Sequence, residues 1–185
     1  MWMPWEGTGL EHLFLLANEE GVFADGVVIG TGEDEPFRVR YRIRCDARWR
    51  VRELMLRSLQ DQGREVRLLA DGEGRWRSAV GGSLPTLEGC IDVDISTTPF
   101  TNTLPIRRLD LGPGETEEIR VAYLDDVSRM SVRPESQRYT RLERHAGGGL
   151  YRYQSLSGSG FTADLPVDDD GLVVDYPGLF RRVRP

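Results

Sequence analysis

The sequence predicts an all-β protein, built mainly from antiparallel strands that form a strongly curved sheet. Three observations lead to this fold class: apolar residues recur with a period of two, turn signals follow at short intervals, and no segment has the period and length of a long helix. Short connections join antiparallel strands, whereas parallel strands need longer helical crossovers, for which this sequence has no room. We expect about ten to twelve strands. A sheet of that size curls, closes or splits into two layers, so a partial barrel is expected and a two-sheet sandwich is the alternative.

The composition indicates a single globular domain over residues 1–185. Hydrophobic residues make up 39% of the chain, enough for one core at this length. The formal net charge is −6, so we expect no nucleic-acid partner. No segment approaches the roughly 20 apolar residues of a membrane span. The first residues lack the basic region of an export signal, so we expect a cytoplasmic protein.

The clearest strand covers residues 37–45, FRVRYRIRC, and one of its faces is entirely arginine. The four residues of this arginine face are Arg38, Arg40, Arg42 and Arg44. Acidic residues of neighbouring strands or solvent can compensate such a face; alternatively, it binds an anion such as a phosphate or sulfate head group. An interaction scaffold that meets an acidic partner through this face is a further hypothesis.

The hairpin that follows this strand predicts a register. A three-residue loop over 46–48 pairs Cys45 with Trp49 and Ile43 with Val51, which keeps the apolar faces together. It also brings arginines opposite one another, Arg44 with Arg50 and Arg42 with Arg52. The apolar phase shifts after Val51, which predicts a bulge in the second strand.

Two aspartates alternate with apolar residues in the strand IDVDI at 91–95. Asp92 and Asp94 should therefore lie on the same side of the strand, about 7 Å apart at their α-carbons. Paired carboxylates can act in glycoside hydrolysis or hold a hard cation. They can equally pair with strand arginines, and the sequence leaves these alternatives open.

A short helical segment is predicted near residues 98–102. Thr98 can cap the first turn, and Pro99 suits the first helical position. We expect one or two turns that end before Pro105.

Other chemistry finds little support in the sequence. There is no G-x-S-x-G nucleophile elbow and no His/Cys pattern for zinc, so we predict no catalytic residues, metal or cofactor. Cys45 and Cys90 occupy apolar strand positions and are expected to be buried thiols. The strands carry many aromatic residues, which suit either an apolar pocket that fixes a polar head group or ordinary sheet packing.

Several segments resemble a bacterial family named putative glycolipid-binding proteins. They are GCIDVDISTTPFTNTLPIRRL at 89–109, QRYTRL at 137–142, DYPGLFRR at 175–182, LEHL at 10–13 and PFRVRYRIRCDARWRVREL from residue 36. The resemblance implies a fold similar to the lipoprotein-localisation carriers: a strongly curved antiparallel sheet that forms a half-open β-barrel, with the short helix across its opening. It implies a lipid-like ligand and brings no established catalytic residues with it.

The combined prediction is a non-enzymatic protein that binds a lipid-like molecule, such as a glycolipid, in the concave face of the curved sheet. Apolar residues inside the sheet would hold the tails, and polar residues at the mouth would bind the head group. The predicted ligand-binding residues are Asp92, Asp94, Asn102, Arg107, Trp49, Tyr139 and Tyr176. The alternative is a hydrolase that acts on a sugar or phosphoester through the aspartate pair, which requires both carboxyls on one cleft floor.

Overall fold

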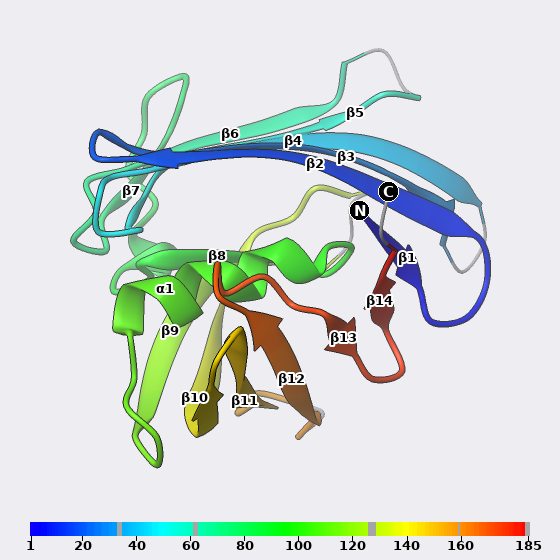
Figure 1. Ribbon diagram of the computed structural model, residues 1–185. Helices are drawn as coiled ribbons and strands as arrows, with labels where there is room; N and C mark the ends of the chain where they lie inside the picture. Colours follow the sequence, from blue (N-terminus) through cyan, green and yellow to red (C-terminus); the bar gives the residue numbers. More distant parts are fainter. Residues whose placement is uncertain (33–34, 61–62, 126–128, 159, 184–185) are drawn as a thin grey trace.

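The computed structural model describes residues 1–32, 35–60, 63–125, 129–158 and 160–183, and within these ranges it is mainly β-structure (Figure 1). The strands are β1 (Trp2–Pro4), β2 (Gly9–Asn18), β3 (Gly21–Thr31), β4 (Pro36–Cys45), β5 (Val51–Ser58), β6 (Glu65–Ala70), β7 (Trp76–Ser78), β8 (Asp92–Ile95), β9 (Thr116–Leu124), β10 (Arg133–His145), β11 (Gly148–Ser155), β12 (Thr162–Asp168), β13 (Asp175–Tyr176) and β14 (Phe180–Arg182). The helical segments are the 3₁₀ helices η1 (Pro85–Leu87) and η2 (Pro99–Asn102) and the α-helix α1 (Thr103–Leu109).

The strands form two sheets. The larger has nine strands in the order β13-β14-β1-β2-β3-β4-β5-β6-β7, and the smaller has five in the order β12-β11-β10-β9-β8. The nine-stranded sheet curls into a half-barrel that arches over α1, with the five-stranded sheet on the other side of the helix (Figure 1). This confirms the all-β fold class, the curved half-barrel and the short helix.

One strand pair differs from the antiparallel rule. β8 pairs with β9 in parallel, and the crossover between them contains η2 and α1. The prediction that the chain has no room for a helical crossover was therefore wrong at this point, because the two short helical segments together suffice.

The predicted register of the arginine strand was also wrong. Cys45 pairs with Val51, and Arg44 pairs with Glu53 rather than with Arg50. The loop spans 46–50, because Trp49 adopts a left-handed conformation at φ 62° and the Asp46 side chain accepts hydrogen bonds from two loop amides. The partner of β4 jumps from Val51 to Glu53, so the predicted bulge in β5 is confirmed.

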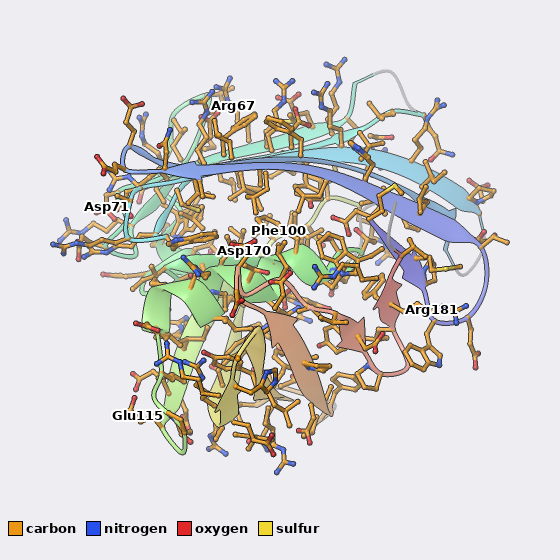
Figure 2. All side chains as sticks on the ribbon, viewed as in Figure 1. Arg67, Asp71, Phe100, Glu115, Asp170 and Arg181 are labelled. Carbon is orange, nitrogen blue, oxygen red and sulfur yellow. The ribbon has the colours of Figure 1, made fainter. Side chains whose placement is uncertain are left out.

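Acidic side chains of neighbouring strands compensate the arginine face. Asp25 of β3 accepts hydrogen bonds from Arg40 at 2.7 Å and from Arg42 at 3.0 Å. Glu53 of β5 lies 3.8 Å from Arg44 and 2.7 Å from Arg67. Arg67 lies on the convex side of the large sheet (Figure 2). Of the alternatives for this face, the interleaved acids are the one observed.

The helical segment begins where the sequence places it and ends later. The Thr98 hydroxyl caps η2 by accepting a hydrogen bond from the Phe100 amide. The chain then continues as α1 through Pro105, which contradicts the expected end before that residue. Pro105 lies in the first turn of α1, where the amide that proline lacks has no partner within the helix.

The main core fills the concave face of the nine-stranded sheet. Phe100 points from η2 toward this sheet, and its ring stacks on that of Tyr41 at a centroid distance of 6.2 Å (Figure 2). Leu104 of α1 and Val93 and Ile95 of β8 belong to the same buried cluster. A second cluster covers the inner face of the five-stranded sheet and contains Tyr139, Tyr151, Tyr153 and Leu165. Side chains therefore occupy the space between the arch and the helical segments.

Candidate functional site

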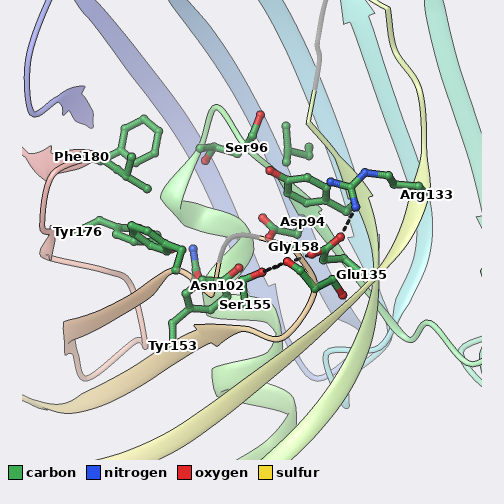
Figure 3. Close-up of a pocket in the computed structure, with 16 residues that line it drawn as sticks. Asp94, Ser96, Asn102, Arg133, Glu135, Tyr153, Ser155, Gly158, Tyr176 and Phe180 are labelled. Atoms are coloured by element: carbon green, nitrogen blue, oxygen red, sulfur yellow. Dashed lines mark hydrogen bonds and ion pairs between the residues drawn. The ribbon is translucent and has the colours of Figure 1, made fainter.

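A cavity of about 470 Å³ lies beside this core, between η2 and the inner face of the five-stranded sheet (Figure 3). Its walls come from four parts of the chain: the end of β8 with η2, the adjoining strands β9 to β11, the segment after β11, and the hairpin of β13 and β14. This volume falls within the range of small-molecule sites, and the lining combines aromatic rings with converging polar groups.

Asp94 carries a carboxylate at the wall of the cavity. It accepts a hydrogen bond from Gln137 Nε2 at 2.6 Å and one from the Thr101 hydroxyl at 3.0 Å. In the described part of the chain no arginine lies within ion-pair distance of it. Burial raises the pKa of Asp94, the two hydrogen bonds lower it in part, and the charge of Glu135 raises it further. Among the described residues, the groups that donate hydrogen bonds to this cavity-lining carboxyl are therefore neutral.

Glu135 of β10 is the second acid of the cavity, and its charge is partly neutralised. Its carboxylate forms an ion pair with Arg133 and accepts a hydrogen bond from the Ser155 hydroxyl at 3.3 Å (Figure 3). Arg133 also reaches Asp125 at 3.3 Å and stacks over the Tyr123 ring at 4.8 Å. The side of the cavity toward β9 and β10 is thus a fixed network of charges and hydroxyls.

Aromatic rings form the opposite wall. Tyr153, Tyr176 and Phe180 follow one another with centroid distances of 6.2 and 6.3 Å, and Phe161 lies 6.1 Å from Tyr176. The rings meet edge to face or tilted, so this wall of the cavity is aromatic but not flat.

Asn102 links the helix to this wall. Its Oδ1 accepts a hydrogen bond from the Tyr139 hydroxyl at 2.9 Å, and its Nδ2 donates to the Pro99 carbonyl at 3.3 Å. Tyr139 is itself buried and packs against Tyr153 at 5.5 Å. Asn102 therefore has a fixed orientation at the cavity wall.

The structure brings together three of the seven predicted ligand-binding residues. Asp94, Asn102 and Tyr176 line the cavity, and Tyr139 supports Asn102 from below. Trp49 and Arg107 lie elsewhere and contact each other, with the guanidinium 5.1 Å from the indole ring.

Asp92 faces α1 instead of the cavity. It is fully buried and accepts a two-pronged hydrogen bond from Arg108, whose Nη2 lies 2.6 Å from Oδ2 and whose Nε lies 3.1 Å from Oδ1. Burial raises the pKa of Asp92, and the guanidinium lowers it in part. Since only Asp94 reaches the cavity, the two carboxyls do not share the cleft floor that the hydrolase alternative requires.

Tyr123 and Tyr153 belong to the strand aromatics that the sequence left open between a pocket and ordinary packing. The cavity residues that the sequence reasoning missed include Arg133, Glu135, Ser155, Phe161 and Phe180. A signal exists in β10, where Glu135, Gln137, Tyr139 and Arg141 alternate with more exposed residues and are all buried. Because the inward residues of this strand are polar, it shows no apolar period of two.

The fold and the cavity define an all-β protein with a ligand-sized, polar and aromatic site between two sheets. The chain belongs to the family described as putative glycolipid-binding, whose model matches residues 1–182. It is similar to the crystal structure of a DUF1089 family protein from Pseudomonas aeruginosa, with 40% sequence identity and a TM-score of 0.84 over 96% of this chain and 94% of that one. None of the curated proteins compared with the chain matches it. Among the described residues, no helix has the length and apolar character needed to cross a membrane.

Proposed function

We propose that this protein binds a glycolipid, without catalysis, by seating its carbohydrate part in the cavity between η2 and the five-stranded sheet. The observation that carries the proposal is the combination of an aromatic wall with a carboxylate, Asp94, that no cation neutralises in the described part of the chain. Sugar rings present C–H faces to aromatic side chains and hydroxyl donors to carboxylates and amides. The family description is consistent with such a ligand.

The polar network suits a hydroxyl-rich ligand better than a bare hydrocarbon. Asp94 accepts from sugar hydroxyls, and Glu135 has one carboxylate oxygen held by Arg133 and the other by Ser155. Hydrogen bonds to a charged acceptor are stronger than neutral ones, so Asp94 should contribute most to affinity.

The apolar part of the ligand is best placed at the rim of the cavity. Phe161 and Leu179 line the cavity and are 36% and 41% exposed, and Leu179 accepts a backbone hydrogen bond from Trp5, whose side chain is also 41% exposed. The concave face of the nine-stranded sheet, where the sequence reasoning placed the tails, is filled by buried side chains. Exposed apolar groups around a polar site are typical of ligand-binding grooves. The cytoplasmic location of the protein stays a prediction. So does the similarity of its fold to that of the lipoprotein-localisation carriers.

Calorimetric titration with octyl β-glucoside as a monomer tests the proposal. We expect Asp94→Asn and Tyr176→Ala each to weaken binding by about tenfold or more. The amide introduced at position 94 can still accept from Thr101, and Gln137 can turn its unpartnered Oε1 toward the new donor, so the fold should persist. Asp164→Asn, on β12 and bound to Arg152, is the matched control and should bind normally. Equal affinity in the Asp94 variant and the control would contradict the proposal.

Solvent extraction of the protein from its native host gives an independent test. Mass spectrometry of the extract should detect a glycolipid with the wild-type chain and much less with Tyr176→Ala. An extract that holds the same lipid for both proteins would show that the lipid does not use this cavity.

A further inference from the structure

A second cavity, of about 270 Å³, lies near the C-terminal end of α1 and is separate from the proposed glycolipid site. Its lining comes from α1, from the hairpin of β10 and β11, and from the end of β12 with the loop after it. Three arginines from two of these elements line it: Arg107 of α1 and Arg141 and Arg144 of β10.

Arg141 is the unusual member of this group, because its charge is buried without a counter-charge. The residue is 6% exposed. Its Nη1 donates to the Leu111 carbonyl at 2.9 Å, and the guanidinium lies 5.2 Å from the centre of the Tyr151 ring. Among the described residues, its buried Nε has no hydrogen-bond partner, and no carboxylate lies within ion-pair distance of the guanidinium. Burying a charge is costly unless it is paired and hydrogen-bonded, so this geometry favours the binding of an anion beside Arg141.

The other charges of the cavity leave room for that anion. Asp168 is held by Arg182 at 2.6 Å. Arg107 donates to the backbone carbonyl of Asp169 at 3.3 Å, and Arg144 is exposed. Asp110 and Asp169 also line the cavity, but both are exposed and can turn toward water. Nδ1 of His145 lies 3.3 Å from the backbone carbonyl of Ala146.

We propose that this cavity binds a small tetrahedral oxyanion, a phosphate or sulfate group, with Arg141 as the buried anchor and Arg107 and Arg144 at the mouth. Guanidinium groups present several donors in a plane and bind such oxyanions with two parallel hydrogen bonds. The small volume suits a free ion or a single head group. This assignment uses residues outside the glycolipid site, so it stands or falls independently of that function.

Thermal unfolding and calorimetry with inorganic phosphate test the assignment, at constant ionic strength kept with chloride. Phosphate should raise the melting temperature of the wild-type chain and give a measurable Kd. Arg141→Met should abolish both effects and should itself melt no lower than wild type without phosphate, because it removes an unpaired buried charge. Arg144→Gln, at an exposed position, should weaken binding about tenfold.

Arg138→Gln is the matched control. Arg138 lies on the same strand but pairs with Glu118 on the outer side, so its loss should leave phosphate binding unchanged. A wild-type chain that responds to phosphate no more than to chloride would overturn the proposal. So would an Arg141→Met chain that keeps the phosphate response.

Vesicles distinguish a free ion from a lipid head group. Sedimentation with phosphatidylcholine vesicles that contain phosphatidic acid, competed by inorganic phosphate and lost in Arg141→Met, would assign the site to a lipid phosphate. Phosphate binding by the wild type with no vesicle binding would assign it to a free ion. Vesicle binding that persists in Arg141→Met would contradict the site.

Discussion

Asp92 and Asp94 stand two residues apart on one strand, yet their neighbours give them different chemistry. Arg108 satisfies Asp92 with a guanidinium in two-pronged geometry and fixes α1 to β8. Within the described part of the chain, the donors to Asp94 are the neutral groups of Gln137 and Thr101, so Asp94 retains capacity for a ligand. The partner decides which carboxylate is structural and which is available.

Breaking the Asp92–Arg108 pair should be costly, because it leaves a buried charge without a partner. We expect Arg108→Met to lower the free energy of unfolding by about 3–5 kcal/mol at a pH where Asp92 is ionised. The double variant Asp92→Asn with Arg108→Met should recover much of that loss. Urea unfolding measures both. Arg67→Met, which removes an exposed pair on the convex face, is the control and should lose less than about 1 kcal/mol.

Some residues of the cavity could be predicted from the sequence and others could not. Asp94 and Asn102 were predicted from the family resemblance and from the polar cluster beside the predicted helix, and Tyr176 from the aromatic residues of the strands. Glu135 was missed because β10 buries polar side chains, so the apolar period that identifies an inward face is absent. Pairings such as Arg107 with Trp49 depend on tertiary contacts that no spacing contains.

At the scale of the element, local patterns predicted strands and the bulge but not the register. The alternation in β4 is clear from its sequence, and so is the phase shift after Val51. The hairpin loop depends on Trp49 at positive φ, a conformation that sequence rules assign to Gly, Asn or Asp. Because the length of the hairpin loop sets the register, this one residue changes the pairing of β4 with β5 along its whole length.

Gly26 lies in the centre of β3, where the Tyr41 ring packs closely against its backbone. A β-carbon there would lie 2.1 Å from Cζ of the Tyr41 ring, which is fully buried and stacked on Phe100. Gly26→Ala should therefore lower the free energy of unfolding by about 2–3 kcal/mol or more through overpacking. Gly7→Ala is the comparison: φ is +84° with nothing within 4 Å, so only a backbone cost of about 1 kcal/mol is expected. Equal losses of unfolding free energy in the two variants, measured by urea unfolding, would contradict this and show that the Tyr41 ring moves aside without cost.

At the scale of the whole molecule, a few long-range contacts join strands of the nine-stranded sheet to segments far away in the sequence. The Trp2 indole donates to the Val173 carbonyl at 2.7 Å, which joins the first strand to the chain before β13. Glu11 of β2 accepts hydrogen bonds from Tyr41 on the large sheet and, at 2.7 Å, from the Thr98 hydroxyl that caps η2. These contacts span up to 171 residues of sequence, so local patterns could not predict them.

Glu11 should make the stability of the molecule depend on pH. It is 3% exposed, and its Oε2 has no hydrogen-bond partner among the described residues. Burial raises the pKa of Glu11 from 4.5 to about 7; the hydrogen bonds of Tyr41 and Thr98 and the nearby N-terminal charge act in the opposite direction. The carboxyl group of Glu11 binds its proton more tightly in the folded state than in the unfolded state. The stability that this proton binding contributes is therefore fully present below pH 4.5 and is lost as the pH rises to about 7.

Glu11→Gln removes this titration and keeps an acceptor for Tyr41 and Thr98. Relative to the variant, the wild-type chain should lose up to about 3 kcal/mol of unfolding free energy between pH 5 and pH 8, measured by urea unfolding at both. The pKa values of Asp92 and Asp94 are also raised, but both residues are present in the two proteins, so their effect cancels in the difference. A difference between wild type and variant that stays constant across this range would mean that Glu11 is ionised in the folded protein throughout. The hydrogen bonds from the Tyr41 and Thr98 hydroxyls would then be sufficient to stabilise a buried, charged Glu11 between β2 and η2.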